Sequence, residues 1–152
     1  MKPLFDLPGV NVALSAFLLN LVWELAQVPL YRGLPSEAHW AAIQRCGRAT
    51  LGDAAIAVVA FWAVAAAARW RRWITAPASV QVMGFVGVAL VMTTILEWLA
   101  THVERRWDYA PGMPLVPLLG IGLAPVLQWM VLPPLVVWFV RRQLTSGISL
   151  VQ

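Results

Sequence analysis

The sequence predicts an all-α fold, an integral membrane antiparallel four-helix bundle. Of the 152 residues, 61% are hydrophobic and only 12% are charged, which is about half the charged fraction of a soluble domain. The chain also contains four apolar runs, each long enough to span a bilayer as a helix. We expect a single transmembrane domain over residues 1–152, with spans at about 10–30, 51–68, 79–100 and 115–140.

The first span has a polar face in its second half. Asn20, Glu24 and Gln27 follow one another at i, i+4 and i+7, so they lie on one side of a helix. Tyr31 extends this face to the membrane interface, and Pro29 is expected to end the span. Arg32 is a candidate ion-pair partner for Glu24.

The connector over residues 32–50 is expected to contain a short interfacial helix between spans 1 and 2. Ser36 and Glu37 resemble a helix start, and Trp40 and Ile43 give a small apolar face behind them. A helix of this kind lies along the membrane surface.

The second span is rich in alanine, and its only acid, Asp53, stands near its predicted start. Small residues allow membrane helices to approach closely, so this helix should be tightly packed. Thr50 and Asp53 match the spacing of a capping box, in which an acid satisfies amides at the start of a helix. Two interpretations of Asp53 therefore remain open, a helix cap and a member of a binding site.

The third span ends in a polar stretch that begins at Glu97 and continues to Tyr109. Glu97 still lies within the apolar run, where an ionisable group costs about 3 kcal/mol. Such a residue is either functional or paired with a buried charge, and the candidate partners include Arg105 and Arg106. The helical spacing of the polar residues predicts that the helix continues past the hydrocarbon and ends by about Tyr109, before Pro111.

The fourth span combines a small-to-polar face with several prolines. Gly120, Ala124 and Gln128 lie on one side of the expected helix. The pair Pro133-Pro134 should bend it, because proline lacks the amide hydrogen and clashes with the preceding turn.

Charges and tryptophans give the expected orientation. Arg69, Arg71 and Arg72 fill one very short loop, which places this loop and both termini in the cytoplasm. The chain is expected in the inner (cytoplasmic) membrane of a bacterium. The nine tryptophans of this tryptophan-rich chain are expected mainly in two aromatic belts that face lipid. One belt is formed by Trp23, Trp40, Trp98 and Trp107, and the other by Trp70, Trp73 and Trp138.

The acids occur at corresponding depths, because successive spans run in opposite directions. Glu24 is late in its span, Asp53 is early and Glu97 is late. We therefore expect the acids to converge on one polar pocket, with Asn20 or Gln128 as its floor and His39 and His102 above it. The candidate ligand-binding residues are Asn20, Glu24, Asp53, Glu97, His102, Arg105, Arg106, Tyr109 and Gln128.

The sequence favours a small multi-pass protein whose carboxylate-lined pocket binds an amphiphilic or cationic ligand or docks a partner membrane subunit. A membrane enzyme that uses Glu97 and Glu24 on a lipid or isoprenoid-like substrate, and an ion- or proton-coupled carrier, are the alternatives. No catalytic residue or cofactor is indicated. Carboxylates and imidazole can ligate a metal, so Glu24, Asp53, Glu97 and His102 are considered as ligands. We predict no metal site, since no dedicated ligand spacing occurs and Cys46 is the only cysteine.

The expected partners are the lipid bilayer and either an amphiphilic small molecule or another membrane protein. The basic residues sit in short clusters beside spans rather than on one extended surface. In a membrane protein such clusters report orientation and contact with anionic lipid. We therefore expect no nucleic-acid partner.

Overall fold

A computed structural model of the chain describes residues 7–146, and its regular structure is helical. The four long helices are α1 (Pro8–Gln27), α2 (His39–Ala67), α3 (Ser79–Trp98) and α4 (Leu123–Ser146). Each is long and apolar enough to cross a membrane. Over residues 7–146 only isolated bridges and no strands occur. The all-α prediction is therefore confirmed, and the four apolar helices indicate an integral membrane protein.

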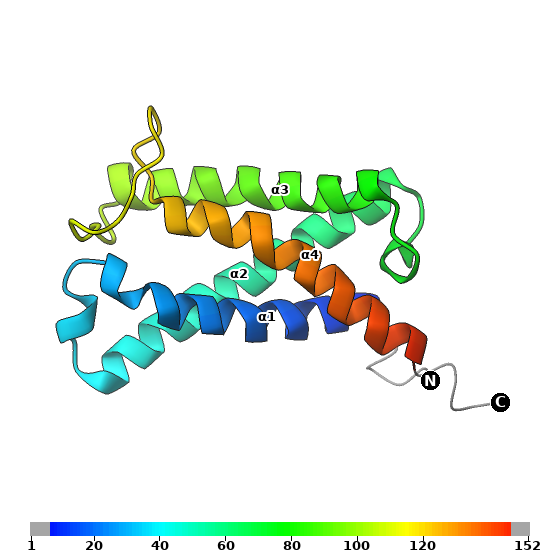
Figure 1. Cartoon of the computed structure of the whole chain (residues 1–152), viewed down its shortest axis with the longest axis horizontal. Coiled ribbons are helices and arrows are strands. Elements are labelled where there is room, and N and C mark those ends of the chain that lie inside the picture. Colours follow the sequence, from blue (N-terminus) through cyan, green and yellow to red (C-terminus); the bar gives the residue numbers. More distant parts are fainter. Residues whose placement is uncertain (1–6, 147–152) are drawn as a thin grey trace.

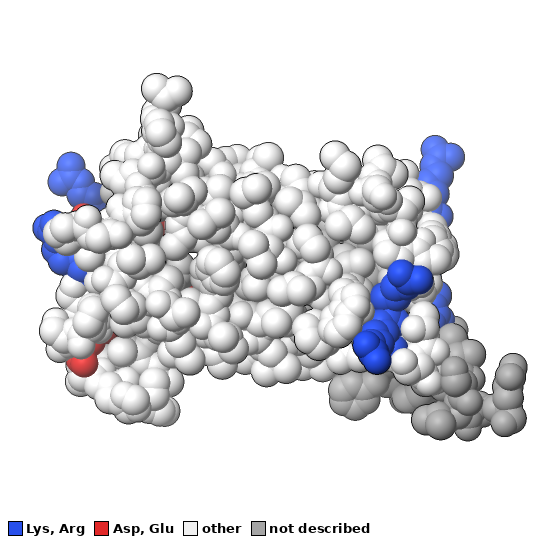
Figure 2. All heavy atoms as spheres, viewed as in Figure 1, with Lys and Arg blue, Asp and Glu red and all other residues white. Residues whose placement is uncertain are grey.

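The helices connect at two opposite ends of the molecule (Figure 1). The α1–α2 and α3–α4 connections lie at one end, which we call the connector end. The α2–α3 connection, the start of α1 and the end of α4 lie at the other, which we call the arginine end. Charged side chains gather at the two ends of the visible face, with an uncharged surface between them (Figure 2). This distribution is the one that a bilayer requires.

The apolar core lies in the half of the bundle nearer the arginine end. Trp73 is fully buried there, and its ring stacks on Phe61 at 5.7 Å and meets Phe85 edge-on at 5.9 Å. Its Nε1 donates a hydrogen bond to the backbone oxygen of Phe61 at 3.3 Å. The expectation that Trp73 belongs to a lipid-facing belt is therefore wrong, because its ring is buried and its indole N–H is hydrogen-bonded inside the protein.

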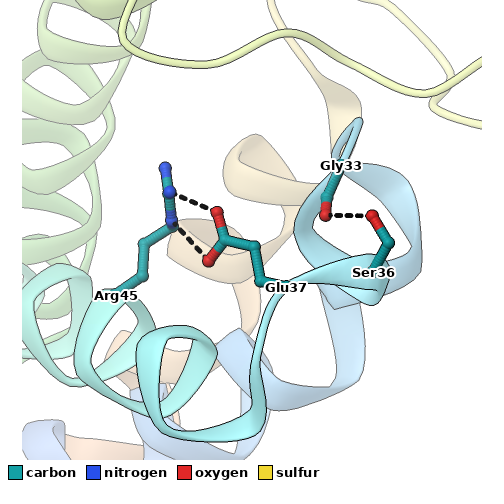
Figure 3. A network of polar contacts seen from close by, with 4 residues as sticks. All are labelled: Gly33, Ser36, Glu37 and Arg45. Carbon is teal, nitrogen blue, oxygen red and sulfur yellow. Dashed lines mark hydrogen bonds and ion pairs between the residues drawn. The ribbon is translucent and has the colours of Figure 1, made fainter.

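The connector holds no separate interfacial helix, because residues 39–50 form the first part of α2. This helix runs without interruption from His39 to Ala67. Ser36 and Glu37 do not cap it. The Ser36 hydroxyl donates to the backbone oxygen of Gly33 at 2.8 Å, and Glu37 forms an ion pair with Arg45 across the turn (Figure 3). Short 3-10 turns η2 (Val28–Leu30) and η3 (Leu34–Ser36) make the connection instead.

Asp53 consequently lies inside α2 rather than at its start, and the predicted capping box is wrong. The Thr50 hydroxyl donates to the backbone oxygen of Cys46 at 2.8 Å, a common arrangement for threonine within a helix. The Asp53 side chain is thus free to contact other helices.

The third helix ends at Trp98, and the helical turn that follows it ends at Val103, earlier than the predicted end near Tyr109. After α3 the chain makes a π-helical turn, η5 (Leu99–Val103), in which the Glu104 amide donates to the Leu99 oxygen at 2.9 Å. π-Turns of this kind are frequent at functional sites.

The fourth helix begins at Leu123, eight residues after the predicted start of the span. Residues 115–122 form a hairpin closed by a bridge between Leu115 and Gly122. Figure 1 shows that it projects sideways from the bundle beside α3. Leu118 at its tip has a φ of 69° and is fully exposed. The proline pair lies inside α4, and the bend expected there stays a prediction.

A short helical turn at the arginine end contributes to the apolar core. This 3-10 turn, η4 (Trp73–Thr75), carries the buried Trp73 and Ile74 between α2 and α3. The next element is α3. Just before its first residue, the Ala78 amide donates a hydrogen bond to Gln81 Oε1 at 2.8 Å.

Candidate functional site

Polar side chains from all four long helices meet in the half of the bundle nearer the connector end. Glu24 comes from α1, Asp53 from α2 and Glu97 from α3. Glu24, Asp53 and Glu97 lie close enough to one another for electrostatic interaction.

Gln128 of α4 joins the acids to the first helix. Its Nε2 donates to Asn20 Oδ1 at 2.6 Å and to Asp53 Oδ2 at 3.1 Å. Asn20 and Gln128 are almost completely buried. The Asn20 amide nitrogen in turn donates to the backbone oxygen of Ala16 at 2.7 Å. We call the group Asn20, Glu24, Gln27, Asp53, Glu97 and Gln128 the polar network.

Glu97 is held by neutral donors from the connector end. Its Oε1 accepts from the Tyr109 hydroxyl at 2.6 Å and from Trp107 Nε1 at 3.3 Å. Tyr31 lies close enough to Glu97 for electrostatic interaction, and its ring meets the Trp107 ring edge-on at 6.4 Å. The three aromatic side chains therefore close the network on the side that faces the connectors.

Backbone pairing fixes these aromatic side chains in position. Tyr31 and Tyr109 form an antiparallel bridge, which brings the α1–α2 connection beside the segment that follows η5. The Arg32 amide donates to the Asp108 oxygen, and the Ala110 amide donates to the Leu30 oxygen, both at 2.9 Å. The Tyr31 and Tyr109 rings lie 5.7 Å apart. The two connections thus form one cover over Glu97.

Both tyrosines are kept in their hydrogen-bond donor form. Burial raises the pKa of Tyr31 above its ordinary value, and the Glu97 carboxyl group raises it further. Burial likewise raises the pKa of Tyr109, with Glu97 as the next cause. A phenol that stays protonated keeps its O–H as a hydrogen-bond donor. The Tyr109 hydroxyl uses it to donate to the Glu97 carboxyl oxygen.

None of the network acids forms an ion pair within residues 7–146. The ion pairs of that range join Glu37 to Arg45 and Glu104 to Arg106, outside the network. The hypothesis that Glu97 pairs with an arginine is therefore wrong, because Tyr109 and Trp107 take that place. Glu24 is not paired with Arg32 either.

Two buried oxygen atoms on α1 and α3 have no hydrogen-bond partner, and a third unpaired group, Trp23 Nε1, is a donor on α1. Gln27 Nε2 donates to Glu24 Oε1 at 2.7 Å, which holds its amide at the Glu24 carboxyl group, while Gln27 Oε1 remains unpaired. Thr93 lies one turn before Glu97 on α3, and its hydroxyl is also unpaired. The exposed fractions are 6% for Gln27 and 8% for Thr93. Buried polar groups normally have partners, so these two indicate capacity for a ligand or ion.

Some predicted site residues lie elsewhere. His102, Arg105 and Arg106 are exposed, and His102 stacks on Trp98 at 5.5 Å. His39, which was expected above the pocket, is exposed at the start of α2. Sequence reasoning assigned Trp107 to a membrane belt and did not include Gln27 in the site. The spacing of Gln27 from Glu24 and Asn20 was the signal that could have included it.

The acids line neither of two hollows found on the surface. A hollow of about 340 Å³ is lined by Trp62, Ala65, Ala66, Arg69 and Arg71. A second, of about 370 Å³, is lined by Thr94, Ile95, Trp98, Leu99 and Leu119. Within the described chain, no group of three or more His, Cys, Asp or Glu side chains is arranged to hold a metal ion.

No protein-family model, curated protein or solved structure matches this chain.

Proposed function

We propose that the chain is an antiparallel four-helix membrane bundle whose polar network binds a small cation, either a proton or a monovalent metal ion. The observation that carries this proposal is the composition of the network. Carboxyl groups from three helices meet without a lysine, arginine or histidine partner among the described residues. Buried charge must be compensated, so a cation is the missing component.

The balance of donors and acceptors supports this choice. The amide nitrogens of Gln27 and Gln128 and the aromatic donors around Glu97 satisfy only part of the carboxyl oxygens. Gln27 Oε1 adds a further unpaired acceptor, and Thr93 Oγ1 can also accept. Such a surplus of oxygen atoms suits a proton or a hard cation.

The packing favours a small occupant. The acids do not line the two surface hollows, and the paired connections cover Glu97. An amphiphile would have to separate the Tyr31–Tyr109 bridge before its headgroup reached the acids. A proton or a dehydrated ion needs no such opening.

Binding from one face fits the network better than transport across the membrane. Between the network and the arginine end most buried side chains are apolar, among them Phe61, Phe85, Val136 and Val140, and the buried polar side chains there are Asn11 and Ser15 of α1. A continuous path for ions requires polar groups or water along its length. We therefore favour a site that is loaded and emptied from the connector end, not a carrier.

Infrared difference spectroscopy of the protein in lipid nanodiscs tests the cation site. A change of pH or an exchange of sodium for a bulky organic cation should alter the carboxyl bands of the wild type. Asp53→Asn should remove most of this change, whereas Glu104→Gln, at an exposed acid, should retain it. Equal spectra for wild type and Asp53→Asn would refute the proposal.

Docking of a partner membrane subunit is a second candidate, favoured by the hairpin over residues 115–122. Leu115, Leu118 and Leu119 are exposed on irregular backbone beside α3. Irregular backbone at membrane depth is stable only where protein or water covers it. A photoreactive residue at Leu118 should form a discrete protein adduct in native membranes, and one at the exposed Met83 of α3 should not. Adducts with lipid alone at Leu118 would exclude docking at this hairpin.

A further inference from the structure

The hollow at the arginine end combines an apolar wall with two arginines. Trp62, Ala65 and Ala66 belong to the last turns of α2, and Arg69 and Arg71 follow the helix directly. Trp62 precedes the last residue of α2 by five positions, which corresponds to about 8 Å along a helix. The wall therefore begins at the depth of upper acyl chains when the arginines lie at the headgroups.

The end of α2 holds Arg69 in an unusual backbone conformation. Its φ is 50°, in the left-handed region that glycine normally occupies at this point of a helix end. The Arg69 amide donates to the Ala66 oxygen and the Trp70 amide to the Ala65 oxygen, both at 3.1 Å. These are the two bonds of a Schellman motif. An arginine in the place of glycine costs stability, so its side chain needs another reason to be there.

The arginines of the hollow have no acidic partner within residues 7–146. The ion pairs of that range lie at the connector end. Figure 2 shows arginine side chains, and no Asp or Glu, on the visible face of the arginine end. The two guanidinium groups are thus available for an external anion. Arginine suits phosphate because its planar fork can bind two oxygen atoms at once.

The Trp62 ring is held in place as the apolar side of this hollow. It meets the Phe61 ring edge-on at 5.0 Å. It also lies against α1 at Gly9, where an added Cβ would be 3.4 Å from the Trp62 ring. A fixed ring beside alanines forms a flat surface against which an acyl chain can pack.

We propose that this hollow binds an anionic phospholipid, with its phosphate at Arg69 and Arg71 and an acyl chain against Trp62. The site lies at the opposite end from the polar network and does not depend on cation binding. It does depend on membrane insertion. General attraction of basic loops to anionic lipid is expected of any such protein; the proposal assigns a particular site to one lipid molecule.

Native mass spectrometry with added phosphatidylglycerol tests the site. Each arginine near the headgroups should contribute roughly fivefold to affinity. The double variant Arg69→Gln/Arg71→Gln should therefore bind roughly 30-fold more weakly than the wild type. Arg141→Gln/Arg142→Gln removes the same charge at the same end but outside the hollow, and it should lose less than about threefold. Equal losses in both double variants would overturn the proposal in favour of unspecific attraction.

Arg69→Gly separates ligand binding from folding. Glycine accepts a φ of 50° without strain, so this variant should unfold at a higher temperature than the wild type. The same variant should bind phosphatidylglycerol roughly fivefold more weakly. Unchanged lipid affinity in Arg69→Gly would overturn the role of Arg69.

Two additional arms identify the chemistry of the ligand. Phosphatidylcholine, whose headgroup has no net charge, should bind more weakly than phosphatidylglycerol and be less affected by the arginine substitutions. Inorganic phosphate at equal concentration should not displace the lipid, because it lacks the chain that contacts Trp62. Equally effective displacement by inorganic phosphate would overturn the lipid assignment and indicate a site for free anions.

Discussion

Replacement of Gln128 by leucine should destabilise the bundle by removing the link between α1, α2 and α4. Leucine fills a similar volume but cannot donate to Asn20 Oδ1 at 2.6 Å or to Asp53 Oδ2 at 3.1 Å. Interhelical hydrogen bonds in membrane proteins contribute about 0.6–1.7 kcal/mol each. Loss of both predicts a decrease of about 1–3 kcal/mol in the free energy of unfolding.

Unfolding by a denaturing detergent, followed by circular dichroism, measures this decrease. In a double-mutant cycle, Asn20→Leu/Gln128→Leu should lose about 0.6–1.7 kcal/mol less than the sum of the single variants, because they share one hydrogen bond. Met130→Leu, at an exposed position of the same helix, is the control and should lie within about 0.5 kcal/mol of the wild type. A Gln128→Leu variant as stable as this control would refute the structural role of the network.

Two further predictions concern the connector end and the orientation of the chain. Gly122→Ala should cost about 1–3 kcal/mol, because its new Cβ would lie 3.0 Å from the ring of Tyr109; Gly112→Ala, with no atom within 4 Å, should leave thermal stability unchanged, and similar losses in both would contradict the argument. In a variant without the native cysteine, a cysteine in place of Trp40 should react with an impermeant thiol reagent in intact cells, and one in place of Ala76 should not. The reverse labelling pattern would place the arginine end outside the cell.

The spacing of apolar residues and the order of the spans along the chain predicted much of the architecture. The four apolar runs identified the long helices to within a few residues, except at the start of α2 and at both ends of α4. The alternation of span direction also led us to expect Glu24 and Asp53 at similar depth, and Gln128 joins Asp53 to Asn20, one turn before Glu24. Both inferences depend on local spacing and on the chain reversing direction, and a single sequence contains both.

The corrections arise where short motifs compete with longer elements. Ser36-Glu37 and Thr50–Asp53 match helix-start patterns, yet α2 runs through the second one without a break. No proline interrupts residues 39–50, so the helix can extend, and tertiary packing outweighs the local capping preference. The spacing of apolar residues alone could not distinguish a separate short helix from a continuous α2.

The neutral partners of Glu97 could not be predicted from local sequence patterns. Tyr31 and Trp107 are far apart in the sequence and meet only because two connections pair through their backbones. The charges of Arg105 and Arg106 made an ion pair the simpler expectation. Their exposure at the surface, where water solvates them, makes the aromatic donors the better partners for a buried carboxyl group.

The length of α2 links bilayer thickness to the hydration of the polar network. A helix of 29 residues is about 43 Å long, whereas the hydrocarbon layer is about 30 Å thick. Figure 1 shows α2 crossing the bundle obliquely, and tilt is one way in which a long helix is accommodated. Asp53 stands near the middle of α2, so the tilt of this helix decides its distance from the headgroups. A thinner membrane would bring water closer to Asp53, and a thicker one would bury it more deeply.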